Sequence, residues 1–136
     1  MSNIIEKDKK TAMRNNAFTA AREFAKKCNG ILGDNCINVI LYGSYARGDF
    51  QEYSDVDIMI LTKDGFKVTL KMKSDIHSLA SSLYFIYYAD ISPRIREASQ
   101  YYTRKNTSGY YMNIDKEGII LYEQKAIFAK MIIRKR

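Results

Sequence analysis

Two short apolar segments and the connection between them constrain the fold of this chain most. The first, Asn38–Tyr42, is followed at once by Gly43-Ser44, and the second, Asp55–Leu61, opens with two aspartates one residue apart. Apolar runs of this length are typical of strands in a sheet that is buried on both faces. A glycine at the end of such a strand permits a sharp turn and a close backbone approach. The pattern predicts two central strands, joined by a segment that begins at a glycine and ends at paired carboxylates.

The spacing of the two aspartates indicates a metal site. In a strand, side chains two positions apart point to the same face, roughly 6 to 7 Å apart, so Asp55 and Asp57 project together while Val56, Ile58 and Ile60 face the other way. Two carboxylates on one face repel each other, and a divalent cation between them keeps both ionised. Mg²⁺ suits such oxygen ligands and is commonly bound by one or two carboxylates together with substrate phosphates. We therefore expect a Mg²⁺ site at Asp55 and Asp57.

The segment after the first strand is typical of a phosphate-binding turn. If a helix begins at Ser44, its first backbone N–H groups point toward an anion. The Ser44 hydroxyl adds a hydrogen-bond donor, and Arg47 adds a cation one turn later. An arginine in a short exposed helix is also common in surface ion pairs, so both roles stay open for Arg47. We expect Gly43, Ser44 and Arg47 to bind phosphate.

Taken together, these residues resemble the signature of a known superfamily. Gly43-Ser44 and Asp55-x-Asp57 at this spacing, with Ala46-Arg47-Gly48 and Ser54 also in place, resemble the polymerase-beta-type nucleotidyltransferases. The short chain is similar to the minimal nucleotidyltransferase branch of that superfamily. The resemblance implies an α/β (α+β) fold, with a small mixed β-sheet flanked by helices. We expect residues 1–136 to form a single nucleotidyltransferase domain.

Residue patterns predict the remaining elements around this unit. Apolar residues at steps of three and four predict a first helix, which Asn29-Gly30 ends. The segment around residues 68–72 fits either a strand or a helix, and we choose the helix because its apolar face is the longer pattern. The expected elements are a helix over 10–28, strands over 38–42 and 55–61, a helix over 68–83, a strand over 84–91 closed by Ser92-Pro93, a short helix after Pro93, a loop over 106–109, a turn into a last strand within 114–122, and a final helix over 123–136.

The resemblance also implies a third carboxylate on a later strand, beside the metal pair. Asp90 is the acidic residue on the predicted strand 84–91, and we assign it this role. Similar minimal chains place the aspartate slightly earlier before the Ser-Pro, at a position that Tyr88 occupies here. A register that brings Tyr88 to the metals would argue against catalysis.

The implied activity is nucleotidyl transfer. Two Mg²⁺ ions held by Asp55, Asp57 and Asp90 would activate an acceptor hydroxyl and stabilise the departing pyrophosphate, while Gly43 and Ser44 hold the triphosphate. The resemblance implies ATP as the donor of AMP. Minimal nucleotidyltransferases are commonly paired with a small helical HEPN protein as antitoxin and toxin, so a HEPN toxin partner is the expected acceptor.

Composition restricts the remaining possibilities. The chain carries a net charge of +7, which favours anionic partners such as nucleoside triphosphates, with RNA as a further candidate. No apolar run approaches a membrane span, and Cys28 and Cys36 without a secretory signal indicate a cytoplasmic protein with reduced thiols. An oligomer stays open. The alternative to an enzyme is a non-catalytic interaction protein, or a nucleotide-binding or RNA-binding module, that retains the fold.

Overall fold

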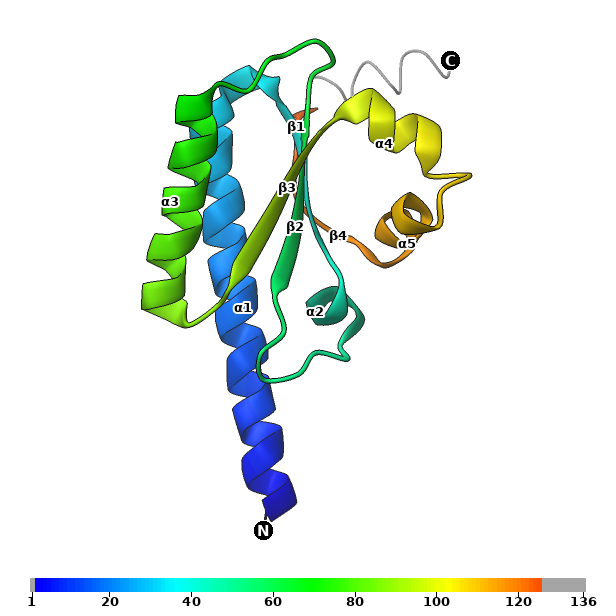
Figure 1. Cartoon of the computed structure of the whole chain (residues 1–136). Helices are drawn as coiled ribbons and strands as arrows, with labels where there is room; N and C mark the ends of the chain where they lie inside the picture. The colour runs from blue at the N-terminus through cyan, green and yellow to red at the C-terminus, as the bar shows by residue number, and fades with distance from the viewer. Residues whose placement is uncertain (1, 126–136) are drawn as a thin grey trace.

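The computed structural model describes residues 2–125 and contains one four-stranded sheet with helices against both faces (Figure 1). The order of the strands is β3-β2-β1-β4, so the predicted small mixed sheet flanked by helices is confirmed. The helices are α1 (Ser2–Leu32), α2 (Ser44–Arg47), α3 (Leu70–Tyr87), α4 (Ala98–Arg104) and α5 (Gly109–Glu117), with a 3-10 turn at Gly33–Asn35, and the strands are β1 (Cys36–Tyr42), β2 (Val56–Thr62), β3 (Ile91–Glu97) and β4 (Ile119–Glu123).

The pairing of the strands brings three chain segments to one edge of the sheet. β1 is antiparallel to both β2 and β4, whereas β3 is parallel to β2 because α3 carries the chain back between them. The end of β1 therefore lies beside the beginnings of β2 and β3. In this register Tyr42 is opposite Asp57, and Asp57 is beside Ser92. The residues that flank these strand ends are those that the sequence predicts to be functional.

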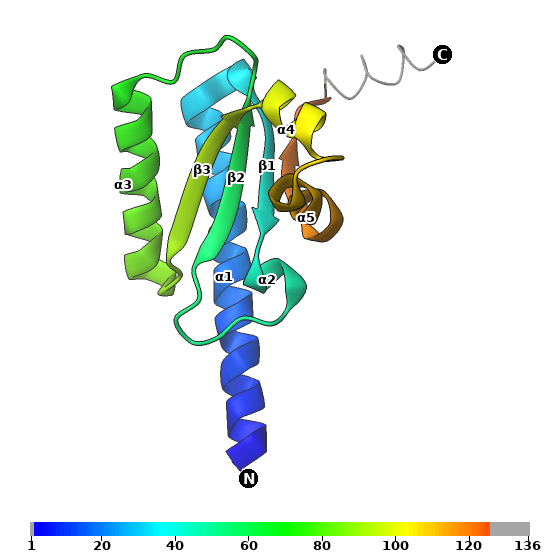
Figure 2. The ribbon, with the colours of Figure 1, turned by 45° about the vertical axis from the view of Figure 1, so that its right-hand side comes forward.

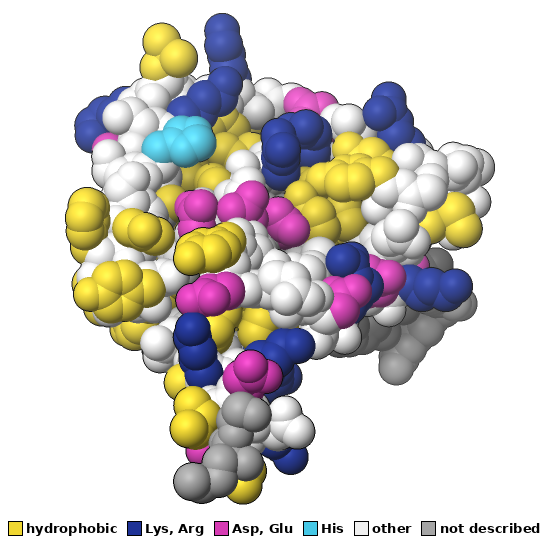
Figure 3. All heavy atoms as spheres, turned by 60° about the horizontal axis from the view of Figure 1, so that its bottom comes forward, with side chains coloured by type: hydrophobic (Ala, Val, Ile, Leu, Met, Phe, Trp, Pro, Cys, Tyr) yellow, Lys and Arg dark blue, Asp and Glu magenta, His cyan; other side chains and the backbone are white. Residues whose placement is uncertain are grey.

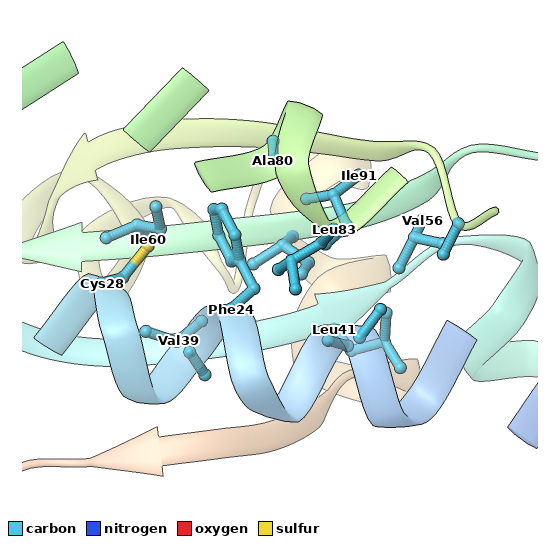
Figure 4. Packing of buried hydrophobic residues seen from close by; sticks show 14 of the residues in the cluster. Phe24, Cys28, Val39, Leu41, Val56, Ile60, Ala80, Leu83 and Ile91 are labelled. Carbon is cyan, nitrogen blue, oxygen red and sulfur yellow. The ribbon is translucent and has the colours of Figure 1, made fainter. Parts of the chain in front are cut away.

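The two faces of the sheet are covered by different helices, as Figure 2 shows. Val56, Ile58 and Ile60 of β2 are fully buried in the larger apolar cluster, which includes α1 and α3 residues. Figure 4 shows Phe24 and Cys28 of α1 and Leu83 of α3 within this packing. Alternate residues of β2 point to the other face, where a smaller cluster joins the sheet to α4 and α5 through Met59, Leu61, Tyr101, Tyr111 and Ile114. Because Asp57 has the parity of Met59, it belongs to the α4/α5 face.

The first helix is longer at both ends than predicted. It runs from Ser2 to Leu32 instead of from Lys10 to Cys28, and its first turns extend past the sheet in Figure 1. The predicted stop at Asn29-Gly30 is wrong, because the helix continues through Gly30 to Leu32. The chain leaves the helix at Gly33, whose φ of 62° suits the left-handed conformation that glycine adopts without steric cost.

The strand predicted over 84–91 is also wrong. α3 continues to Tyr87, and its last residues keep the spacing of the buried positions Ile76, Ala80 and Leu83. The strand begins only at Ile91 and passes through Ser92-Pro93, which therefore does not close it. In the described part of the sheet β3 is an edge strand, where proline removes no hydrogen bond to a second neighbour.

The chain after β3 differs from the prediction in one element. The expected short helix is α4, and the last strand is confirmed as β4. The turn expected at Ile114–Gly118 is instead the end of α5, a helix that sequence reasoning missed. The helix predicted over 123–136 falls almost entirely outside the described residues, and Glu123 itself belongs to β4. Among the helices within residues 2–125, none combines the length and the apolar content needed to cross a bilayer.

Candidate active site

Three aspartates gather where β2 and β3 begin. Asp55 directly precedes β2 and Asp90 directly precedes β3, and the backbone N–H of Val56 donates to the carbonyl oxygen of Asp90 at 2.8 Å. Figure 3 shows acidic side chains grouped near the centre of the face that carries this edge. Tyr88 is the left-handed residue that ends α3 (φ 56°), and it is 81% exposed. The register therefore places Asp90, rather than Tyr88, beside the Asp55 carboxylate.

The electrostatics of this group reflect crowded like charges. Partial burial, and then the charge of Asp55, raise the pKa of the Asp57 carboxyl, while Arg94 and Arg47 oppose the rise. Burial also raises the pKa of Asp90, and the Asp55 charge and a hydrogen bond with Asp55 act in the same direction. Asp55 is thus the central member, since it interacts with both other carboxylates. Such a group favours a nearby cation.

The donor set suits a hard divalent cation that also binds its substrate. Within residues 2–125, no group of three or more His, Cys, Asp or Glu side chains is arranged so that it could hold a metal ion by itself. Mg²⁺ does not require such a cage, because it is usually bound by one or two carboxylates, water and substrate phosphates. Asp55 and Asp57, with Asp90 against Asp55, supply oxygen ligands of this kind. The residues present therefore fit Mg²⁺ bound together with a phosphate-bearing substrate.

Gly43 allows the Asp57 carboxylate to lie directly against the backbone. Gly43 has a φ of 79° and precedes α2. A Cβ at this position would overlap Oδ2 of Asp57 and would lie 3.1 Å from its Cγ. Any larger residue would therefore displace the carboxylate, in addition to the strain of a backbone conformation that is nearly exclusive to glycine. The glycine of the motif and the second aspartate form one structural unit.

Arg47, predicted to contact phosphate, is engaged in two ion pairs. Its Nε donates to Asp49 at 3.2 Å, and its Nη1 donates to Glu117 at the end of α5, also at 3.2 Å. Ser44 begins the single turn of α2, and its carbonyl oxygen accepts from the N–H of Gly48 and of Asp49. Arg47 thus links α2 to α5 and still lines the same cavity as Gly43 and Ser44.

Two cavities open beside the aspartates. One, of about 380 Å³, contains Asp57 together with Gly43, Ser44 and Arg47, and its far wall is α5. The other, also of about 380 Å³, contains Asp90. The further lining of this second cavity comes from α1, α2, the loop before β2, and the end of α3 with the two residues that follow it, namely Lys9, Met13, Asn16, Tyr45, Glu52, Tyr53, Ser54, Tyr84, Tyr87, Tyr88 and Ala89. Both volumes are in the range of small-molecule sites.

Sequence reasoning missed two contributions to the site. Arg94 on β3 has the same parity as Ser92, and its charge acts on Asp57, yet it forms no ion pair with any described side chain. The alternation Asp90-x-Ser92-x-Arg94 would have indicated it, had the strand been placed correctly. The other contribution is α5, whose Tyr110, Asn113 and Glu117 line the Asp57 cavity.

The fold and the site define a class of protein that binds phosphate groups beside metal-binding carboxylates at one edge of a sheet. Residues 22–110 match the family described as nucleotidyltransferase domain. The match spans well over half of the chain, and the chain belongs to this family. It is a nucleotidyltransferase.

Similar proteins agree with this assignment. The chain is 49% identical to the putative protein adenylyltransferase MJ0141 of Methanocaldococcus jannaschii over 74 residues, which cover 54% of this chain and 73% of the relative. It is 27% identical to MJ0604 of the same organism, which bears the same description, over 107 residues, or 79% of this chain and 99% of the relative. The crystal structure of a putative nucleotidyltransferase from Sulfolobus solfataricus has a similar fold, with a TM-score of 0.56 at 15% identity, covering 85% of this chain and 88% of that one. A toxin-antitoxin crystal structure with AMP-PNP gives a TM-score of 0.50 at 15% identity, covering 83% and 82% of the two chains.

Proposed function

We propose that this nucleotidyltransferase transfers AMP from ATP to a hydroxyl group of a partner protein. The observation that carries the proposal is the convergence of the Gly43-Ser44 turn with Asp55, Asp57 and Asp90 at one sheet edge. The description of its relatives as protein adenylyltransferases supports AMP as the group and protein as the acceptor. We further propose that residues 1–136 form a single domain.

Gly43, Ser44 and Arg47 bind the triphosphate in the Asp57 cavity. Backbone approach at Gly43 and the hydroxyl of Ser44 suit phosphate oxygens, and Arg47 supplies a guanidinium at the same wall. Since Arg47 is paired with Glu117 and Asp49, phosphate binding replaces at least one of these carboxylates. Arg94, which is free of ion pairs among the described residues, offers a second cation toward Asp57.

Asp55 and Asp57, with Asp90 as third ligand, hold Mg²⁺ in a two-ion site. When bound, the ions neutralise the phosphate charge, lower the pKa of the acceptor hydroxyl and stabilise the departing pyrophosphate. The side chains keep the acceptor oxygen and the α-phosphorus in line, which is the main contribution of the protein to such a reaction.

The reaction is a single displacement at phosphorus. The acceptor oxygen forms a bond to the α-phosphorus of ATP, the bond from that phosphorus to the oxygen bridging to the β-phosphate breaks, and pyrophosphate leaves. Asp90 accepts the proton of the acceptor hydroxyl. The Asp90 cavity is the side from which the acceptor enters, because the Asp57 cavity holds the nucleotide.

The rim of the Asp90 cavity favours a protein acceptor. Tyr53 and Tyr88 line this cavity and are 91% and 81% exposed. Phe85 is 77% exposed, and its ring meets that of Tyr84, which also lines the cavity. Exposed apolar side chains gathered at one place are typical of protein interaction sites. The chain resembles minimal nucleotidyltransferases that are paired with HEPN toxins, and a toxin-antitoxin complex has a similar fold. We therefore propose a HEPN-family protein as the acceptor and an antitoxin role for this chain.

The proposal is tested with ATP labelled in its α-phosphate, Mg²⁺ and a HEPN protein from the same organism. The native chain is compared with Asp55→Asn and with Asp75→Asn, which removes a carboxylate of α3 whose one ion-pair partner among residues 2–125 is Lys71. We expect label on the HEPN protein with the native chain and with Asp75→Asn, and none with Asp55→Asn. Equal labelling by all three proteins would contradict the assigned site.

A non-catalytic binding protein that retains the fold is the second candidate. The observation that supports it is the exposed aromatic surface of Tyr53, Tyr88 and Phe85, which would bind a partner without any chemical step. Such a protein would bind ATP with Mg²⁺ and would bind the HEPN partner, but it would release no pyrophosphate. The labelling experiment separates the two candidates, provided that nucleotide binding is measured on the same sample.

A further inference from the structure

One face of α5 forms the wall of the nucleotide cavity opposite the phosphate turn. Tyr110, Asn113, Ile114 and Glu117 all line this cavity, and their spacing of three and four residues places them on one face of the helix. Ile114 is buried against the sheet and fixes the helix in place. The other three present an aromatic ring, an amide and a carboxylate to the cavity.

Tyr110 is held firmly while part of its ring stays accessible. Its hydroxyl is 2.8 Å from the hydroxyl of Tyr42, and its ring meets Tyr42 and Tyr111 edge to face, at interplanar angles of 89° and 76°. Neither neighbouring ring lies parallel to the Tyr110 ring, and Tyr110 as a whole is 45% exposed. The ring therefore offers a fixed surface on which a planar group can stack.

Asn113 lies one turn further along the same wall and is exposed. Among the described residues its side-chain amide forms no hydrogen bond, whereas the neighbouring Tyr111 hydroxyl is occupied by Gln100. An amide carries one acceptor and one donor group side by side. This pair matches the N6 amino group and N7 of adenine, while guanine presents two acceptors on the same edge.

We propose that α5 is the nucleoside subsite, in which Tyr110 stacks on the base and Asn113 selects adenine over guanine. The inference rests on the proposed function, because it takes the Gly43-Ser44 side of the cavity as the phosphate end. The cavity of about 380 Å³ spans both groups of residues, so one nucleotide reaches from Ser44 to Asn113. The base preference then lies in a helix outside the family motif.

The test is equilibrium binding of Mg²⁺ complexes of the α,β-methylene analogues of ATP, GTP and CTP, measured by calorimetry. These analogues cannot release pyrophosphate, so the readout is independent of catalysis. We expect Asn113→Ala to reduce the preference for the ATP over the GTP analogue about tenfold, as for loss of one bidentate base contact. Tyr110→Ala should weaken binding of all three analogues by about tenfold through loss of stacking.

The matched control is Met112→Ala, which truncates a residue of α5 that is 45% exposed and does not line the cavity. It should leave all three affinities unchanged, and thermal melting shows whether each variant folds. An unchanged ATP to GTP ratio in Asn113→Ala, or an equal effect of Met112→Ala, would overturn the subsite. If base-selective binding holds but no acceptor is labelled, the subsite stands and the proposed transfer fails. If the acceptor is labelled and Asn113→Ala leaves the ATP to GTP ratio unchanged, the proposed transfer stands and the subsite fails.

Discussion

The two faces of the sheet differ in their share of tyrosines. The α1/α3 face buries a larger and mainly aliphatic cluster, in which Phe24, Ile58 and Leu83 are fully enclosed. The α4/α5 face has a smaller cluster that includes Tyr101 and Tyr111, with Tyr42 and Tyr102 packed against it. Hydroxyls of this group bond to polar partners: Tyr101 donates to Asp115 at 3.1 Å and Tyr102 donates to Asn38 at 2.8 Å. The contrast indicates that one face supplies stability, while the other positions polar groups around a cavity.

The largest effect on stability should come from the aliphatic face. Leu83→Ala leaves a cavity between α3 and the sheet and should lower the free energy of unfolding by about 2 to 5 kcal/mol. On the other face, Tyr102→Phe leaves the buried Asn38 amide oxygen without its partner and should cost about 1 to 3 kcal/mol. Urea unfolding of both variants measures the difference. A larger loss of unfolding free energy in Tyr102→Phe than in Leu83→Ala would contradict the assignment of the α1/α3 face as the main source of stability.

The largest effect on activity should come from the aspartates, with no loss of stability. Asp57→Asn should lower the rate of pyrophosphate release by about 10²- to 10³-fold, as expected when one charge-stabilising group is removed from a reaction centre. Its free energy of unfolding should be unchanged or higher, because the substitution relieves repulsion with Asp55. Steady-state kinetics and urea unfolding test both statements. A variant that is inactive only because it is unfolded would not support the site.

Gly43→Ala should affect both properties, and a second glycine separates the causes. Gly65 has nearly the same φ as Gly43, 78° against 79°, but a Cβ there would meet nothing within 4 Å. Gly65→Ala should cost about 1 to 2 kcal/mol of stability through backbone strain. Gly43→Ala should cost at least as much, because its ψ of −157° lies in a region that is nearly exclusive to glycine and its Cβ overlaps the Asp57 carboxylate. Only Gly43→Ala should reduce activity, because its Cβ displaces the Asp57 carboxylate. Equal activities of the two variants would show that the contact between Gly43 and Asp57 has no functional role.

The smallest expected effect is a gain. Glu117→Gln weakens one of the two ion pairs that hold Arg47 and should raise the affinity for the Mg²⁺ complex of the ATP analogue by about threefold, in line with the modest strength of exposed pairs. The comparison variant is Asp75→Asn, which breaks a pair on α3 away from the site. Raising the salt concentration should reduce the difference between native and variant chains. A weaker affinity in Glu117→Gln would mean that Glu117 itself holds the nucleotide.

The sequence predicts the aliphatic face and the aspartate edge well, because both depend on local spacing. Gly43-Ser44, Asp55 and Asp57 lie at strand ends that apolar runs define, and the positions of Ile76 and Leu83 follow a helical period. Asp90 lies beside Asp55 although the strand predicted over 84–91 is wrong. The strand begins directly after Asp90 instead of ending there, so the aspartate is still at a strand end.

The α4/α5 face could not be predicted to the same degree. Residues 84–88 are aromatic and β-branched, so local propensity favours a strand, but burial of Leu83 continues the helix to Tyr87. α5 begins at a glycine and contains two tyrosines, and its apolar residues are too few to show a clear period. The contact between Tyr110 and Tyr42, 68 positions apart, arises only from the folded arrangement.

The most direct test of this account is to map where the nucleotide binds. Backbone amide shifts of the chain are recorded by NMR during titration with Mg²⁺ and the α,β-methylene analogue of ATP. We predict that the largest changes fall on Gly43, Ser44, Asp57 and the α5 residues Tyr110 and Asn113, with little change on the α1/α3 face. Shifts confined to that aliphatic side, or no saturable shifts at all, would contradict the division of the molecule into a stabilising face and a nucleotide-binding face.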